Sequence, residues 1–325
     1  MRVYLTVAVL WFVVTAPYAW SAGGEFLSLC GVDVSARWTG AAFVSSLSIL
    51  CTTAVVAWLH ILTRGRPNTD PSTAVRTVLT GAALFGLYLA PLLLGGSAVA
   101  AVVSRLAHLG LLVWLVVSLC RRHGLSPQDW GLWPRPARDL WSGKSAKTMS
   151  LALEACVLAA PLALLFSMLP GPVQQVDQTT VEGYGPGLFF GHMLWSSVVE
   201  EVVTTGAVAA LLSTVRRPVG EIALVVGVMR AIPHLYFGLP ALAMLALGAA
   251  CTVLYLRHRR PLPLAAGHFA YNLLTLLPFI LAAGLAGLVL VLLGRVEKRT
   301  APGAKGPAGT AMRTRPDGHA RGPAS

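Results

Sequence analysis

The chain has 325 residues, of which 55% are hydrophobic and only 12% are charged, whereas soluble domains contain about 25% charged residues. So few polar residues cannot coat two soluble domains, and the composition excludes that architecture. The 25 Lys and Arg residues outnumber the 13 Asp and Glu residues, which gives a net charge of +12. This excess is typical either of a nucleic-acid-binding surface or of the cytoplasmic loops of a membrane protein.

Ten apolar runs follow one another along the chain. A helix needs about 20 apolar residues to cross a hydrocarbon core, and the seventh, ninth and tenth runs are short by this measure. Only Pro278 separates the last two, which form either one bent span or two half-spans. We therefore predict an all-α, polytopic membrane bundle of about eight to ten transmembrane helices. The runs cover residues 3–20, 40–62, 77–95, 98–119, 148–170, 188–213, 221–236, 238–256, 263–277 and 279–294.

The basic residues alternate with these runs. If each run crosses once, all Lys and Arg residues except Arg37, Arg105 and Arg230 fall on one side of the membrane. By the positive-inside rule, the N-terminus, the basic loops and the C-terminal tail are cytoplasmic, in a multi-pass protein of the cytoplasmic (inner) membrane. The net charge thus predicts topology, and the expected partners include the lipid bilayer but no nucleic acid.

Four segments are predicted. N-terminal transmembrane helices are followed by a basic interfacial loop on the cytoplasmic face, which includes Trp130. A second set of transmembrane helices follows, and then a basic cytoplasmic tail rich in Pro, Gly and Ala, expected to be disordered. The first apolar run is either a cleaved signal peptide or a retained anchor, and we predict retention. The segments are residues 1–119, 120–147, 148–294 and 295–325.

Ionisable groups inside the runs are the most informative residues. Each costs about 2.5–3.5 kcal/mol at the centre of a bilayer and has to be offset by a partner or a function. Most of them lie after residue 188, and we expect Arg105 and Glu154 to form a structural ion pair. The groups are Arg105, His108, Glu154, His192, Glu200, Glu201, Arg230, His234 and His268, together with the polar Asn272.

Glu200 and Glu201, in SSVVEEVVTTG, are adjacent near the middle of their run. Neighbouring α-helical positions point about 100° apart, so at most one carboxylate is expected to face a site squarely while the other finds a second partner. A buried carboxylate is a candidate general base. The alternative is an ion pair that only packs helices together.

Two further motifs follow at hairpin-length intervals. His234 lies in VMRAIPHLYFG, where Pro233 is expected to kink the helix. His268 and Asn272, in AAGHFAYNLL, are four residues apart and share one helix face. An imidazole and a carboxamide in this arrangement can orient a water or stabilise an oxyanion. Either motif could instead form a hydrogen bond between helices.

In this order and spacing, the three motifs resemble those of the CPBP family, the CAAX-protease, bacteriocin-processing and Abi-type glutamic intramembrane endopeptidases, which carry EExxxR, FxxxH and HxxxN/B. The loop LSPQDWGLWPRP and the small-residue-rich helix from Gly238 to Cys251 support the resemblance, which covers about residues 120–290. It implies a catalytic core within residues 148–294. It further implies site roles for Glu200, Glu201, His234, His268 and Asn272, with His192 and Arg230 as supporting residues.

The family mechanism implies that Glu200 activates a water held with His234, while His268 and Asn272 bind the oxyanion. No cofactor is expected. A zinc ion held by Glu200, His234 and His268 stays an alternative, because one carboxylate and two imidazoles are also a zinc ligand set.

Two positions depart from the family pattern. Thr205 stands where the motif has Arg, and Arg230 stands where it has Phe. Our hypothesis is that Arg230 supplies, from the next helix, the cation that pairs with Glu201. The alternative is a family member that has lost catalysis.

The leading prediction is therefore an intramembrane endopeptidase that cleaves a membrane protein or a lipid-anchored peptide. Its substrates would be prenylated C-terminal tails, bacteriocin-type leaders or C-terminal sorting anchors, and the composition favours a bacterial source and hence the last two. One alternative is a non-catalytic immunity or scaffolding protein. The other is a proton-coupled transporter, which predicts a symmetry between the two halves that the sequence lacks.

Overall fold

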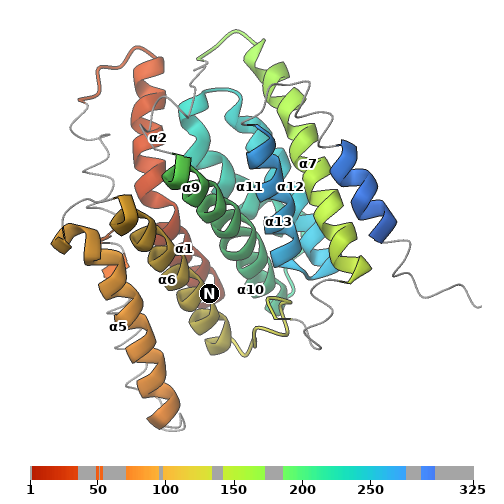
Figure 1. The fold of residues 1–325 in the computed structure, drawn as a ribbon. Helices are drawn as coiled ribbons and strands as arrows, with labels where there is room; N and C mark the ends of the chain where they lie inside the picture. Colours follow the sequence, from red (N-terminus) through yellow and green to blue (C-terminus); the bar gives the residue numbers. More distant parts are fainter. Residues whose placement is uncertain are drawn as a thin grey trace, which may run out of the picture.

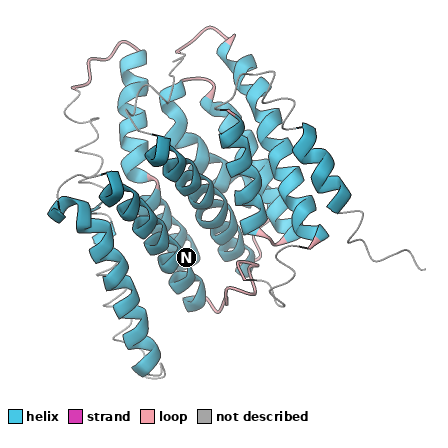
Figure 2. Cartoon of the chain, viewed as in Figure 1, coloured by secondary structure: helices cyan, strands magenta, loops and turns pink. Residues whose placement is uncertain are grey.

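A computed structural model describes the chain over residues 2–35, 49–50, 52–53, 71–94, 98–133, 142–172, 186–275 and 287–296. Within these ranges the chain consists of helices and their connections, with no β-strand (Figures 1 and 2). The predicted all-α membrane bundle is confirmed. Of the predicted interfacial loop 120–147, the structure describes residues 120–133 and 142–147. Of the predicted tail 295–325, it describes only residues 295 and 296, at the end of a short helix.

The first predicted span is broken. Helices α1 (Arg2–Val14) and α2 (Ala16–Leu29) are bent by 63° at Thr15. Pro17 has no backbone N–H to continue the α1 ladder, so the helical run 3–20 bends here. Helix α2 also extends beyond residue 20 and packs against the segment that carries His234.

The next described helices are α5 (Pro71–Leu94), α6 (Ala98–Arg122) and α7 (Gly143–Ser167). They confirm the predicted runs 77–95, 98–119 and 148–170 as helices, and α5 packs against α6. Most of run 40–62 lies outside the described residues.

The second half of the chain forms the centre of the bundle (Figure 1). Helix α9 (Pro186–Val198) continues through a π-helix, η2 (Val199–Ala207), into α10 (Val208–Thr214). Helix α11 (Val219–Ala231) continues into the 3₁₀-helix η3 (Ile232–Phe237). Helices α12 (Ala241–His258) and α13 (Pro261–Leu274) complete this group.

Among the described helices, five are long and apolar enough to cross a membrane, or six if the bent pair α1–α2 counts as one span. The predicted eight to ten refers to the whole chain, and this count covers only the described residues. Helix α13 has 14 residues and is therefore about 21 Å long, less than the roughly 30 Å of a hydrocarbon core. The helix at 287–296 is also short.

Close helix packing at glycines sets the positions of the central helices. A Cβ at Gly248 of α12 would lie 2.8 Å from the Cα of Gly227 of α11, and one at Gly267 of α13 would lie 2.5 Å from the carbonyl oxygen of Met149 of α7. Small residues of this kind allow backbones to approach within a membrane bundle.

The loop after α6 contacts the core of the bundle at one of its tryptophans. Trp130 is fully buried, and its carbonyl oxygen accepts a hydrogen bond from the Tyr255 hydroxyl at 2.9 Å. The ring belongs to the buried core of the bundle. Trp133 is exposed.

Candidate active site

The two glutamates lie in the first turn of the π-helix η2. The Thr205 hydroxyl donates a hydrogen bond to the carbonyl oxygen of Glu200, five residues earlier, at 2.9 Å. A π-helical turn is wider than an α-helical turn, so adjacent residues point less than 100° apart, and such turns are frequent at functional sites. Both carboxylates reach the same guanidinium, but only Glu200 is partly exposed, whereas Glu201 is fully buried.

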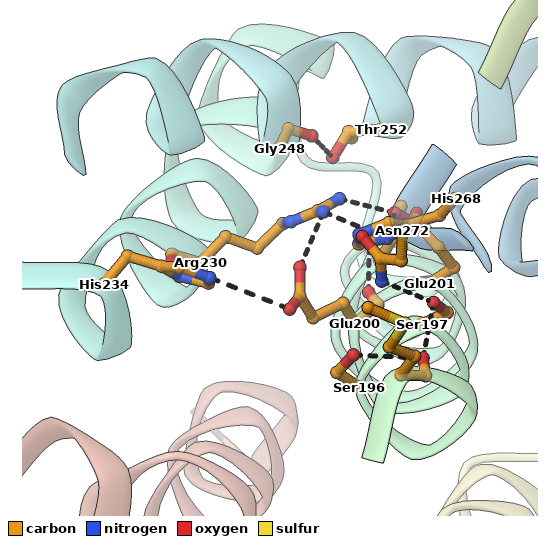
Figure 3. Close-up of polar contacts among 12 residues, drawn as sticks. Ser196, Ser197, Glu200, Glu201, Arg230, His234, Gly248, Thr252, His268 and Asn272 are labelled. Carbon is orange, nitrogen blue, oxygen red and sulfur yellow. Dashed lines mark hydrogen bonds and ion pairs between the residues drawn. The ribbon is translucent and has the colours of Figure 1, made fainter. Parts of the chain in front are cut away.

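That guanidinium belongs to Arg230, in the last turn of α11, and its side chain is completely buried. Nη1 donates to Glu201 Oε1 at 2.6 Å, and Nη2 donates to Glu200 Oε2 at 2.6 Å (Figure 3). The hypothesised pairing with Glu201 is therefore present, and the contact with Glu200 adds to it. Two carboxylates share one cation in the interior of the bundle.

His234 faces Glu200 from the 3₁₀-helix η3. Its Nδ1 donates to the carbonyl oxygen of Arg230 at 2.7 Å, and because a carbonyl only accepts, Nδ1 carries the proton. Nε2 is then free to accept, and it lies 4.0 Å from Glu200 Oε1. The side chains of His234 and Glu200 are 20% and 18% exposed, whereas those of Arg230 and Glu201 are fully buried. The exposed pair is the part of the cluster that a substrate can reach.

His268 and Asn272 approach from α13. His268 Nδ1 lies 3.0 Å from Glu201 Oε1 and 3.5 Å from Arg230 Nη2. Asn272 Nδ2 donates to the Ser197 hydroxyl at 3.0 Å (Figure 3). The structure thus brings together all five predicted catalytic residues and Arg230.

Ser197 is a site residue that the sequence analysis missed. Its side chain is buried, and its hydroxyl donates to the carbonyl oxygen of Met193 at 2.8 Å while it accepts from Asn272. The sequence does contain a signal for it, since Ser197 lies four residues before Glu201 and hence on the same helix face.

The outer polar residues His192, Arg105 and Glu154 make contacts away from Arg230. His192 Nδ1 lies 2.5 Å from Arg105 Nη1, a contact that joins α9 to α6. The predicted ion pair between Arg105 and Glu154 is wrong. Glu154 is exposed on α7, where it accepts a hydrogen bond from Ser150 at 3.0 Å.

The donor set does not fit a divalent metal. In the part of the chain that the structure describes, no group of three His, Cys, Asp or Glu side chains is arranged to hold one. The Arg230 guanidinium already bonds both carboxylates and lies 3.5 Å from His268 Nδ1. A metal held by Glu200, His234 and His268 would have to bind beside this fixed positive charge.

Comparison with known proteins adds one match. The family model described as "Type II CAAX prenyl endopeptidase Rce1-like" matches residues 184–274. The predicted family resemblance is confirmed. This Rce1-like region holds all five predicted catalytic residues and Arg230, and at the level of the family it supports an intramembrane endopeptidase. No curated protein and no solved structure matches the chain.

Proposed function

We propose that the protein is an intramembrane endopeptidase in which Glu200 activates a water to hydrolyse a peptide bond. The observation that carries this proposal is the Glu200–His234 pair, whose Oε1 and Nε2 atoms are 4.0 Å apart. That separation is too long for a direct hydrogen bond. A water about 2.8 Å from each atom would bridge them at an angle of about 90°, which is close to the tetrahedral preference of water.

The first step follows from the arrangement of Glu200 and His234 around this water. Glu200 Oε1 accepts one proton of the water and His234 Nε2 accepts a hydrogen bond from the other. The water oxygen forms a bond to the carbonyl carbon of the substrate, and the carbonyl π electrons move to its oxygen. The amide of Asn272 and the Nε2–H of His268 donate to this oxyanion.

The second step completes the hydrolysis. Glu200 returns its proton to the amide nitrogen, the C–N bond breaks, and the oxyanion electrons restore a carbonyl. The products are a carboxylic acid and an amine. Glu200 is then ionised again and is ready for another water.

The substrate is a membrane protein or a lipid-anchored peptide, because the buried cluster is reached from within a bundle whose outer helices carry exposed apolar side chains such as Leu79 and Leu164. We place the termini in the cytoplasm and the protein in the inner membrane of a bacterium, on the distribution of its Lys and Arg residues. Leaders and C-terminal sorting anchors are the substrates that this location favours.

One observation favours a second candidate function, a non-catalytic scaffolding or immunity protein. Arg230 Nη2 bonds Glu200 Oε2 directly at 2.6 Å. A guanidinium in this position stabilises the ionised glutamate and thereby weakens it as a base.

The first assay uses the full chain in liposomes with two quenched fluorescent peptides, a prenylated CAAX peptide and the same peptide without the prenyl group. The second assay uses cells that express anchored leader and sorting-signal reporters. Glu200→Gln and His234→Ala should each lower kcat by about 10²-fold or more. Glu154→Gln is the matched control, because it changes an exposed carboxylate of α7 outside the site. Cleavage that survives Glu200→Gln would refute the mechanism, and a folded wild type that cleaves no probe would favour the scaffold.

A further inference from the structure

We infer that Arg230 is the shared counter-charge of both glutamates, moved from their own helix to the neighbouring one, and that it is the positioning residue of the site. This inference rests on the proposed function for its effect on catalysis. Its effect on stability does not depend on that function.

Arg230 holds four of the five catalytic residues. Its guanidinium bonds Glu201 Oε1 and Glu200 Oε2, and it lies 3.5 Å from His268 Nδ1. Its backbone carbonyl accepts the Nδ1 proton of His234. Because one guanidinium nitrogen occupies Oε2 of Glu200, the other oxygen, Oε1, is the one left to face His234.

The packing around Arg230 is adapted to its side chain. A Cβ at Gly248 would lie 3.0 Å from Arg230 Cδ, and one at Gly227 would lie 2.7 Å from the carbonyl oxygen of Leu245. These two glycines let α11 and α12 approach while the arginine stem passes between them. A phenylalanine at position 230 would not reach the carboxylates.

Position 205 does not supply a cation in this chain. In the family pattern its arginine lies four residues after the second glutamate, so such a pair stays within one helix. Here Thr205 is buried and its hydroxyl bonds the carbonyl oxygen of Glu200 inside η2. The ion pair therefore links η2 to α11, and the position of His234 relative to Glu200 depends on Arg230.

The charges explain why the arginine cannot simply be absent. Two ionised carboxylates and one guanidinium share an interior from which water is largely excluded. Removing one partner of a buried ion pair leaves an uncompensated charge and is strongly destabilising, whereas removing both partners is often tolerated. This difference separates a counter-charge from an arginine that only fills space.

The first experiment measures the thermal unfolding of the full chain in detergent. Arg230→Met should lower Tm by about 5 °C or more, and Arg230→Met with Glu201→Gln should recover at least half of that loss. Arg257→Met, at the exposed end of α12, is the matched control and should stay near wild type. If Arg230→Met does not fold but the double variant with Glu201→Gln does, that result also supports the role of Arg230 as a counter-charge. A stable Arg230→Met, or no recovery in the double variant, would overturn the inference.

The second experiment restores the family pattern and measures cleavage of whichever peptide probe the wild type cleaves. Arg230→Phe should lower kcat by about 10²-fold with KM within threefold. Adding Thr205→Arg should recover about tenfold of kcat but not all of it, because the link between η2 and α11 stays absent. Arg230→Lys should fall between, since lysine lacks the forked geometry that spans two carboxylates. Equal losses in Arg230→Phe and its Thr205→Arg double variant would overturn the relocation. If the wild type cleaves neither probe, the proposed function fails while the Tm series still decides the counter-charge.

Discussion

Gly248→Ala tests whether the spacing of α11 and α12 sets the geometry of the site. The new Cβ would lie 2.8 Å from Gly227 Cα and 3.0 Å from Arg230 Cδ. Carbon atoms pack at about 3.5–4.0 Å, so α11 would have to move away by about 0.7–1.2 Å. The obstacle is backbone, and a change of side-chain rotamer cannot remove it.

Two opposing contributions determine the effect on stability. Overpacking costs about 1–3 kcal/mol, and alanine is favoured over glycine in a helix by about 1 kcal/mol, so the net loss is about 0–2 kcal/mol. Catalysis should suffer more. Arg230 bonds both carboxylates at 2.6 Å, and a shift of about 1 Å at a reacting centre can cost about 10²-fold in rate.

The measurements are Tm in detergent and kcat and KM in liposomes. Gly220→Ala is the matched control, because it lies in the first turn of the same α11 and a Cβ there would have nothing within 4 Å. We expect kcat to fall by about 10–100-fold in Gly248→Ala and to stay unchanged in Gly220→Ala. Equal kcat in the two variants would refute the dependence of the site on this contact.

Two further predictions concern Ser197 and Asp129. Ser197→Ala removes the acceptor that orients Asn272 and should lower kcat by about tenfold with little change in KM. Ser196→Ala is the control and should be neutral, because among the described contacts the Ser196 hydroxyl bonds only the Met193 carbonyl. If both variants lose activity, the cause is a disturbance of helix α9 and not the loss of the bond to Asn272. Hydrogen bonds from the Ser126 side chain and backbone N–H hold the pKa of Asp129 below its ordinary value, so its stabilising contribution is present above the unfolded pKa and is lost as pH falls through the folded one. Asp129→Asn should therefore make Tm less sensitive to pH between about pH 5 and pH 3, and an unchanged acid profile would contradict this.

The residues of the site were accessible to sequence reasoning because ionisable groups are rare within apolar runs. Glu200, His234 and His268 stand out for their cost in a bilayer, and their order identifies the family pattern. The pairing of Arg230 with Glu201 follows from the two departures taken together, since a missing cation at position 205 and an extra one at position 230 point to a single exchange.

The arrangement of those residues depends on contacts that no local pattern encodes. The π-helix η2 is stabilised where it packs, for example at Gly206, where a Cβ would lie 2.9 Å from Pro261 Cβ. The bond from Asn272 to Ser197 depends on how α13 is rotated against α9. Pro17 does give a local signal for the break between α1 and α2, but hydropathy continues through it and predicts a single span.

The separation of the counter-charge from the glutamates also constrains how the chain enters the membrane. The ribosome delivers Glu200 and Glu201 before Arg230, which follows roughly 1.5–6 s later at ordinary synthesis rates of about 5–20 residues per second. During that interval the segment Phe190–Thr214 carries two acids without their cation, at a mean hydropathy of 1.3. Each acid alone would cost about 2.5–3.5 kcal/mol at the bilayer centre. We therefore expect the hairpin that ends with α11 to insert more stably than the segment Phe190–Thr214 alone.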